Sequence, residues 1–445
     1  MTTLHFTLIF FFIFSKFTII DSSSTPFVAP IEIDDSTKLY IISIFIRTPL
    51  ESADLLLDVG GQFSWIDCTA GSYASTTHRY VRCRSDLCRS IDSIACSNCF
   101  QSSGPGCHND SCALFPENPV ARNAVLAQAL VDTAALMTTD GRKIGELGAV
   151  PDFVVSCSDE SLLKGLPEGV CGLAGLGRSN ASLPAQIEKE RRGRKKKGFL
   201  TEWPTRRGPK LQPGRERGMR VVFPLPACYH ITVTPMSGAP TPFPIKVSSV
   251  YASPNIFALC LPNPSSPSPG SAFFNSAGPY YFSPGIDLSS HLLYTPLVLS
   301  PIGLTTIIYN HRPSAEYFIN VTSINVNGIP VDLNRKLLKI DDDGIGGTRL
   351  STVTPYTVLE SSIYKAFTKL FKNESEKLNL TVTDPVDPFD VCYPASDVMT
   401  TRLGPAVPTV DLVMHSDDVF LEDFWREFDG EGGEGRRRSV VPRVC

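Results

Sequence analysis

Residues Leu55–Cys68 read LLLDVGGQFSWIDC, and residues Gly344–Phe367 read GIGGTRLSTVTPYTVLESSIYKAF. In the first stretch an apolar run ends at Asp58-Val59-Gly60-Gly61, a pattern that favours a strand entering a tight turn. In the second stretch Ser351 holds the place that Asp58 has in the first, about 290 residues earlier in the chain. Either turn alone would fit an ordinary hairpin, but the matching pair predicts one scaffold built around two related turns.

The two turns resemble the active-site turns of a pepsin-type aspartic protease. Such enzymes need two carboxylates that share a proton, so that one acts as a base on water and the other as an acid on the carbonyl. Here Ser351 replaces the second aspartate, and Val59 and Gly61 replace the usual Thr and Ser of the first turn. We therefore expect Asp58 to be ionised and without a general-acid partner, which makes Asp58 and Ser351 a degenerate dyad.

Other catalytic groups do not fill the gap. Asp341, Asp342 and Asp343 lie eight to ten residues before Ser351, and the intervening Gly344-Ile345-Gly346-Gly347 indicates a turn that places them on the wrong side. The chain has no Gly-X-Ser-X-Gly elbow, and its 7 histidines show no local triad signature. The sequence thus predicts a pseudo-enzyme.

The composition indicates an ordered protein of two domains, or one bilobal unit. The chain has 445 residues, of which 42% are hydrophobic and 19% charged, and its 68 Gly and Pro residues favour strands with many turns. Strands are predicted within Lys38–Cys68, at Phe153–Cys157 and across Tyr317–Leu333. The only clear helical periodicity runs from about Ser361 to Lys372.

Within the third predicted strand region, Asn327-Gly328 separates two short apolar runs. This dipeptide is typical of a type I′ hairpin turn, because both central positions need a positive φ.

The N-terminus predicts export from the cell. An apolar run from Phe6 to Phe14 is too short to span a bilayer comfortably, Lys16 interrupts it, and polar residues follow at Asp21. We interpret residues 1–24 as a signal peptide, with an N-terminal anchor as the alternative, and expect no membrane span in the mature chain.

The 13 cysteines fit an oxidising compartment, and seven of them crowd between Cys68 and Cys112. Some of these cysteines are close enough in the chain to form half of a zinc site. No matching second pair of Cys or His lies at zinc-finger spacing, so no metal is expected. The odd count leaves at least one unpaired thiol, with Cys171, Cys228 and Cys445 as candidates. Disulfides are expected at Cys68, Cys83, Cys88, Cys96, Cys99, Cys107, Cys112, Cys157, Cys260 and Cys392, and glycosylation at the sequons of Asn109, Asn180, Asn320, Asn373 and Asn379.

Two stretches depart from the strand pattern. Residues 188–220 hold thirteen Lys or Arg against four Glu, a net of +9 in a chain whose total is -4. A basic run can bind nucleic acid, but export makes that partner improbable, and we expect a solvated loop. Residues 427–445 are Gly-rich and charged and predict a tail.

Several further motifs resemble one plant family, the inhibitors of microbial endoglucanases that include xyloglucan-specific endoglucanase inhibitors, extracellular dermal glycoprotein and basic 7S globulin. They are DVGGQFSWIDC, CHNDSCALFPENPV, GLAGLGRSNASLPAQ, EYFINVTSINVNG, the second turn, and TTRLGPAVPTVDLVM. The resemblance covers most of residues 27–187 and 251–420. It implies an all-β, bilobal pepsin-like fold of double-ψ acid-protease barrels, inactive as a protease.

The resemblance also implies the mode of action, in which loop side chains enter the substrate cleft of a glycoside hydrolase. Arg402 lies in the loop where the family presents an arginine to that acidic cleft, and Arg312 is a weaker candidate from another loop. A solvated surface arginine is the alternative for both. The implied lobes are residues 25–290, with 188–250 as an atypical basic insertion, and residues 291–426, which we expect to be an incomplete C-terminal lobe.

Together these observations predict a secreted, extracellular protein of the apoplast or cell wall that inhibits a microbial xyloglucan-specific endoglucanase or xylanase in plant defence. No cofactor is implied, and a cell-wall or peptide ligand remains open. The alternatives are an active pepsin-type aspartic endopeptidase and a storage or peptide-binding globulin. Fold alone does not select the hydrolase, because loop shape sets that choice.

Overall fold

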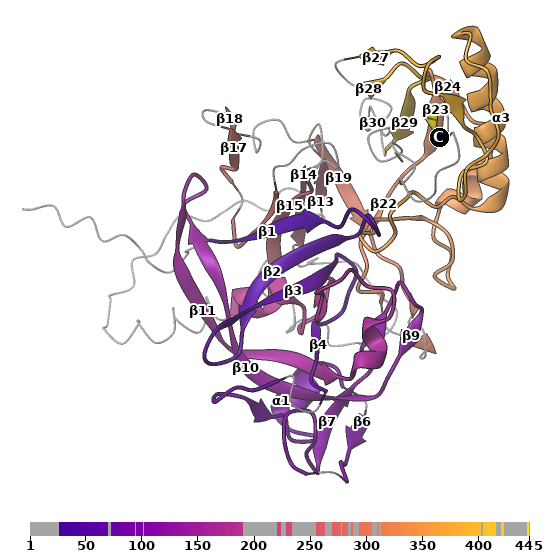
Figure 1. Cartoon of the computed structure of the whole chain (residues 1–445). Helices are drawn as coiled ribbons and strands as arrows, with labels where there is room; N and C mark the ends of the chain where they lie inside the picture. The colour runs from indigo at the N-terminus through magenta and orange to yellow at the C-terminus, as the bar shows by residue number, and fades with distance from the viewer. Residues whose placement is uncertain are drawn as a thin grey trace, which may run out of the picture.

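The structure is a computed structural model in which most of the chain can be described. The described residues are 26–69, 73–93, 95–100, 102–189, 220–223, 228–233, 255–262, 269–276, 278–283, 286–287, 293–304, 309–310, 313–401, 404–414, 420–421 and 443–444. Strands dominate this part of the chain, and Figure 1 shows them in two lobes, with the helix α3 (Ser361–Lys377) on the outer side of the C-terminal one.

The N-terminal lobe is built on long antiparallel pairs. Strand β2 (Tyr40–Ile46) pairs with β3 (Glu51–Asp58), and β10 (Ala127–Thr139) pairs with β11 (Ile144–Ser158). Alternate residues of β2 are buried, as expected for a strand with one face on a core. The fully buried side chains of Ile42, Leu55 and Phe153 belong to one continuous core.

A crossed arrangement of strands carries the first turn. Strand β12 (Gly172–Gly175) runs parallel to β3, with Gly175 opposite Asp58, and antiparallel to β4 (Trp65–Asp67), which in turn runs parallel to the end of β11. The strands approach closely at Gly175, where a Cβ would lie 2.5 Å from the carbonyl oxygen of Phe63. Asp58 thus sits at the end of a strand that pairs with both β2 and β12.

Six antiparallel strands connect the two lobes. Their order is β19 (Leu293–Val298), β13 (Arg220–Phe223), β14 (Cys228–Val233), β15 (Asn255–Cys260), β16 (Gly270–Phe274) and β1 (Phe27–Ile33). Two of these strands, β13 and β14, fall within residues 188–250, the stretch that the sequence marks as an insertion. The stretch therefore contributes to the sheet, through residues 220–223 and 228–233.

The C-terminal lobe holds a four-stranded sheet covered by α3. The sheet order is β24 (Ile329–Pro330), β23 (Ser323–Val326), β29 (Val410–Val413) and β30 (Phe420–Leu421). The helix begins after Glu360, whose carboxylate caps the N–H groups of Ser362 and Ile363, and it buries the side chains of Ile363, Phe367 and Phe371.

Short elements complete the two lobes. Near the disulfides lie β5 (Arg79–Tyr80), α1 (Asp86–Ser90), β6 (Ala95–Ser97), β7 (Ser111–Leu114), β8 (Glu117–Asn118), β9 (Asn123–Ala124) and the 3-10 turn Glu160–Leu163, while residues 183–189 are helical. Further along are β17 (Tyr281–Ser283), β18 (Ile286–Asp287), β20 (Gly303–Leu304), β21 (Tyr309–Asn310), β22 (Phe318–Ile319), the 3-10 turn Arg335–Leu338, β25 (Thr348–Arg349), β26 (Tyr393–Pro394), β27 (Thr400–Thr401), β28 (Gly404–Pro405) and β31 (Arg443–Val444).

The prediction of a two-lobed, all-β chain is confirmed. The predicted hairpin is present between β23 and β24, where Asn327 and Gly328 have φ values of 48° and 74° as a type I′ turn requires. The predicted helix is five residues longer than its sequence pattern indicated, ending at Lys377. Among the described residues, no helix is both long and apolar enough to cross a membrane.

Candidate functional site

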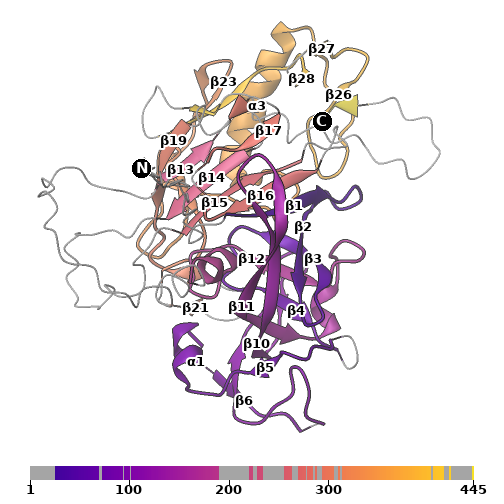
Figure 2. The same cartoon turned by 90° about the vertical axis from the view of Figure 1, so that its left-hand side faces the viewer.

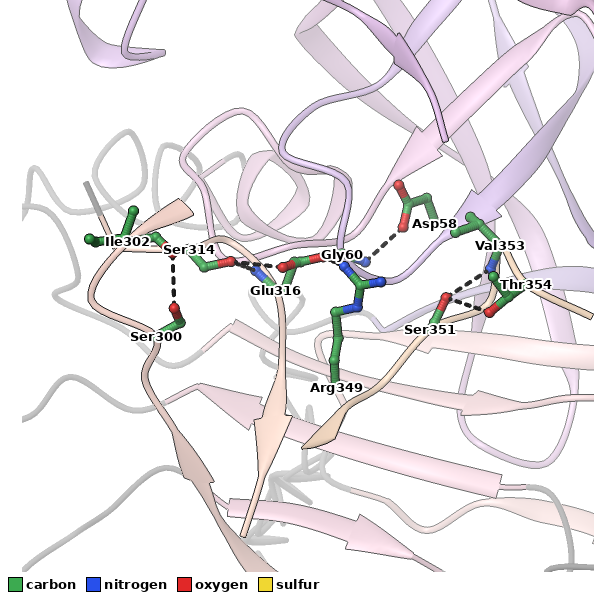
Figure 3. A network of polar contacts seen from close by, with 10 residues as sticks. All are labelled: Asp58, Gly60, Ser300, Ile302, Ser314, Glu316, Arg349, Ser351, Val353 and Thr354. Carbon is green, nitrogen blue, oxygen red and sulfur yellow. Dashed lines mark hydrogen bonds and ion pairs between the residues drawn. The ribbon is translucent and has the colours of Figure 1, made fainter. Parts of the chain in front are cut away.

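The site lies where the two turns meet between the lobes (Figure 3). Asp58 ends β3, and its carboxylate Oδ1 accepts a hydrogen bond from the N–H of Gly60 at 2.9 Å. Strand β25 leads into the second turn and pairs with β22, with Arg349 opposite Phe318. Both turns are therefore anchored by strand pairing immediately before them.

The second turn grips the first through one threonine. The buried Thr352 hydroxyl donates to the carbonyl oxygen of Leu57 at 2.5 Å and accepts from the N–H of Val59 at 3.1 Å. Val59 has no hydroxyl and cannot return such a bond from the first turn. The contact between the turns is thus one-sided, in agreement with the loss expected from the Val59 substitution.

Ser351 does not act as a partner for Asp58. It is exposed, and its hydroxyl lies 3.4 Å from the N–H of Val353 and 3.2 Å from the hydroxyl of Thr354. Figure 3 shows dashed lines from Ser351 to Val353 and Thr354 and none between Ser351 and Asp58. The hydroxyl is engaged in its own turn.

A second carboxylate that the sequence analysis missed lies near Asp58. Glu316 contacts the first turn, because a Cβ on Gly60 would lie 3.1 Å from the Glu316 Cγ. Its two oxygens are already engaged: Oε1 accepts from Arg349 Nη1 at 2.5 Å, and Oε2 accepts from the Ser314 hydroxyl at 3.1 Å. This carboxylate is held in an ion pair rather than placed to share a proton.

Burial and these neighbours change the expected ionisation of Asp58, because together they raise its pKa. Burial raises the pKa of Asp58 to about 6, the N–H of Gly60 opposes that rise, the Glu316 charge adds to it, and the Arg349 charge opposes it. The residue keeps some exposed surface, but protein surrounds the carboxyl group itself. Asp58 is therefore largely protonated at pH 5 and largely ionised at pH 7.

The segment that carries Glu316 is fastened to the N-terminal lobe. Arg178, just after β12, donates through Nε to the carbonyl oxygen of Glu316 at 3.1 Å and through Nη2 to that of Ser314. The Tyr317 hydroxyl donates to the carbonyl oxygen of Leu176 at 3.0 Å. These hydrogen bonds hold residues 314–317 against the N-terminal lobe.

The neighbourhood of Glu316 and Arg349 has no signal in the sequence alone. Glu316 lies two residues before Phe318, which pairs with Arg349, so their positions are diagonal neighbours across two strands. The register of that pair is needed to see this, and short strands such as β22 and β25 do not declare it. Asp341, Asp342 and Asp343 are exposed in a turn that Asp341 itself stabilises.

The cysteines close the N-terminal lobe. The structure joins Cys68 to Cys157, Cys83 to Cys96, Cys88 to Cys112 and Cys99 to Cys107, and Cys260 and Cys392 are also disulfide-bonded. The sulfurs that a zinc site would use are therefore tied up in disulfides. Cys171, one of the candidates for an unpaired thiol, is free.

The remaining predicted residues fall into two groups. Arg402 and Arg312 lie outside the described residues, although β27 and β28, which flank Arg402 in the chain, pair through Thr400 with Pro405 and Thr401 with Gly404. Of the five sequon asparagines, Asn109, Asn373 and Asn379 are exposed and Asn180 and Asn320 are half-buried.

Comparison with known proteins shows the same architecture elsewhere. Two family models match the chain: "Xylanase inhibitor N-terminal" over residues 40–200 and "Xylanase inhibitor C-terminal" over residues 316–428. The protein "Probable aspartic proteinase GIP1" of Glycine max is 40% identical over 405 residues, covering 91% of this chain and 76% of its own.

Solved structures agree with these matches. The crystal structure of edgp superposes with a TM-score of 0.73 and 33% identity, covering 95% of this chain and 86% of that one. Conglutin gamma from lupine seeds, described as a basic 7S globulin, superposes with a TM-score of 0.60 and 26% identity over 93% of this chain and 84% of its own. The predicted pepsin-like fold and the family resemblance are confirmed.

Proposed function

Because this chain belongs to the xylanase-inhibitor family of pepsin-like proteins, we propose that it is a proteolytically inactive, secreted inhibitor of microbial cell-wall glycoside hydrolases. The observation that carries the proposal is the state of the former active site. Ser351 is turned into its own loop, and both oxygens of Glu316 are engaged by Arg349 and Ser314. The fold is kept, but proton sharing, on which proteolysis depends, would need a second carboxylate that is free to accept the proton, and Glu316 is not.

In this proposal, the inhibitory contacts come from loops outside the site formed by the turns of Asp58 and Ser351. We propose Arg402, between β27 and β28, as the residue that enters the hydrolase cleft, with Arg312 as a lesser contact. Glycosidases work with paired carboxylates, and a planar guanidinium engages a carboxylate through two parallel hydrogen bonds. Strands β27 and β28, which precede and follow Arg402 in the chain and pair with each other, would limit the conformational freedom that Arg402 loses on binding.

The Arg402→Ala variant tests this assignment. The inhibition constant against a sensitive xyloglucanase or xylanase should rise roughly 30-fold or more, as for the loss of a central interface arginine. The control is Arg335→Ala, which removes an exposed arginine from the 3-10 turn Arg335–Leu338. Equal inhibition by parent and Arg402→Ala would exclude Arg402 as the contact while leaving inhibition itself intact.

Export supports the same function. We propose that residues 1–24 are removed as a signal peptide and that the mature chain acts outside the cell, where its disulfides persist. The exposed Asn109, Asn373 and Asn379 are the sequons best placed for glycans. Mass spectrometry of the secreted protein tests both points, and an intact N-terminus on protein from the medium would contradict the cleavage.

Two observations favour other functions. The name of the Glycine max relative is that of a probable aspartic proteinase, which keeps an active endopeptidase in view. Pepstatin-sensitive cleavage of denatured protein at acid pH by the pure chain would support it. Likeness to a seed globulin favours a storage or peptide-binding role, which gains if the folded protein leaves both hydrolases unaffected.

A further inference from the structure

Two hollows in the surface adjoin β5 in the N-terminal lobe and form a groove. Figure 2 shows β5 at the opposite end of the molecule from α3. The two hollows have volumes of about 440 and 400 Å³ and share His78 and Arg79. The first hollow is also lined by Tyr80, Arg82 and His108. We call the two hollows together the β5 groove. Each volume is in the range of small-ligand sites.

The first hollow presents two arginines and a flat aromatic face. Arg79 pairs with Asp152 through Nη2, and Arg82 pairs with Asp110 through Nε at 2.9 Å. A guanidinium carries five N–H donors, and these ion pairs engage a single nitrogen of each side chain. Since the side chains of Arg79 and Arg82 are 64% and 74% exposed, a dissolved anion can reach both.

The aromatic face is formed by Tyr80 and His108. Their rings are stacked with centroids 4.7 Å apart and an interplanar angle of 21°. Tyr80 is 47% exposed, so the stack offers a flat ring face beside the two guanidinium groups. This combination suits a ligand whose ring can lie with one face on the aromatic pair and which carries an anionic substituent.

The second hollow presents hydrogen-bond acceptors and therefore suits a ligand that carries hydrogen-bond donors. Threonines and Asp152 are among the residues that line it. Two of the threonine hydroxyls already donate a hydrogen bond within the protein. Thr76 donates to the carbonyl oxygen of Thr48 at 3.2 Å, and Thr77 donates to Asp132 at 2.6 Å. Thr77 Oγ1 also accepts from the Thr48 hydroxyl at 2.7 Å, so the Thr76 hydroxyl oxygen is the better acceptor for a ligand hydroxyl group.

We propose that the β5 groove binds an acidic oligosaccharide, a chain of uronic-acid sugars. One sugar ring lies on the Tyr80–His108 stack with its carboxylate on Arg79 and Arg82, and the next donates its hydroxyls in the second hollow. An acidic peptide fits less well because it has no sugar ring to lie on the Tyr80–His108 stack and no hydroxyl groups to donate in the second hollow. This inference is independent of hydrolase inhibition, since it uses no residue of the site between the lobes.

The probe is an oligogalacturonate of defined length, titrated calorimetrically into the full secreted chain. The protein is first deglycosylated, because the Asn109 sequon adjoins His108. Saturable binding is expected, with affinity at least roughly tenfold lower for the methyl-esterified oligomer, which lacks the charge that pairs with arginine.

Three single substitutions test whether the oligosaccharide binds in the β5 groove. Arg79→Ala and Tyr80→Ala should each weaken binding roughly tenfold or more, through a lost charge-assisted hydrogen bond and a lost stacking face. The matched control is Arg89→Ala on α1, because that side chain is also 64% exposed and also paired with a carboxylate, Asp86. Its affinity should equal that of the parent.

Three results would overturn the proposal. They are the absence of saturable binding, an equal loss of affinity in Arg89→Ala, and binding of an oligoglutamate peptide as tight as that of the sugar. The second would mean attraction by overall charge, and the third an acidic-peptide site. Circular dichroism of each variant confirms that it is folded.

Discussion

The hydroxyl of Thr352 accepts a hydrogen bond from the backbone N–H of Val59, at 3.1 Å and across 293 residues of chain. Its own proton goes to the carbonyl oxygen of Leu57 at 2.5 Å. One side chain therefore satisfies two buried backbone groups of the first turn. The side chain of Val59 has no hydroxyl and cannot make the reciprocal hydrogen bonds to the second turn. Thr352 therefore joins the two turns.

Replacement of Thr352 by Val keeps the shape of the side chain and removes both hydrogen bonds. Two buried backbone groups lose their partner, which should lower the free energy of unfolding by about 1–3 kcal/mol. Urea denaturation measures this. The control Thr354→Val removes an exposed hydroxyl and should change stability by less than about 0.5 kcal/mol. Equal losses in the two variants would show that Thr352 does not hold the turns together.

Asp58 should make stability depend on pH in an unusual direction. Burial raises its pKa to about 6 from an ordinary 3.8, so the folded state holds the proton more tightly than the unfolded state. Stability from this residue is then full below about pH 4 and is lost as pH rises through about 6. Relative to the parent, Asp58→Asn should gain up to about 3 kcal/mol between pH 4 and pH 7, since one pKa unit corresponds to about 1.4 kcal/mol.

Asp140→Asn supplies a control of opposite sign. The N–H groups of Lys143 and Arg142 hold the pKa of Asp140 below its usual range, so its contribution is present at neutral pH and fades as pH falls through the folded pKa. The Asn variant should therefore lose stability at pH 7 and approach the parent in acid. A stability difference for Asp58→Asn that does not vary with pH would contradict the raised pKa.

The charges of Glu316 and Arg349 should shift Asp58 in opposite directions. The Glu316 charge raises the pKa of Asp58 and the Arg349 charge lowers it. In a carbon-13 NMR titration of the Asp58 carboxyl group, Glu316→Gln should lower the measured pKa and Arg349→Gln should raise it. Arg335→Gln, at an exposed position, should leave it unchanged. Shifts of the same sign in the first two variants would refute this arrangement of charges.

Gly61 marks how far the first turn has departed from a protease. A Cβ at this position would lie 2.9 Å from the Gly175 Cα and 3.0 Å from Asp58 Oδ2, closer than side-chain atoms pack. Gly61→Ala should therefore destabilise the fold by about 1–3 kcal/mol. Gly104→Ala is the matched control, since nothing lies within 4 Å of its Cβ. Unchanged stability in Gly61→Ala, measured by thermal unfolding, would mean that the turn can readopt a side chain there.

The sequence predicted features that depend on neighbouring residues. The Asn327-Gly328 hairpin follows from local turn chemistry, and the helix from Ser361 follows from its apolar period, so both were found. Glu316 was missed because its ion pair with Arg349 depends on how β22 and β25 pair, and its contact with Gly60 depends on how the two lobes meet. The disulfide partners, such as Cys68 with Cys157, depend on strand order in the same way and do not follow from spacing.

We propose that this pepsin-like chain inhibits glycoside hydrolases and does not cleave peptides. The most direct measurement titrates the folded, secreted chain into a microbial xyloglucan-specific endoglucanase and into a xylanase, and follows the rate of polysaccharide hydrolysis. We predict that at least one enzyme loses its activity as the chain reaches an equimolar amount, while the chain itself shows no pepstatin-sensitive proteolysis. Unchanged hydrolysis of both polysaccharides in a large excess of the chain would contradict the claim.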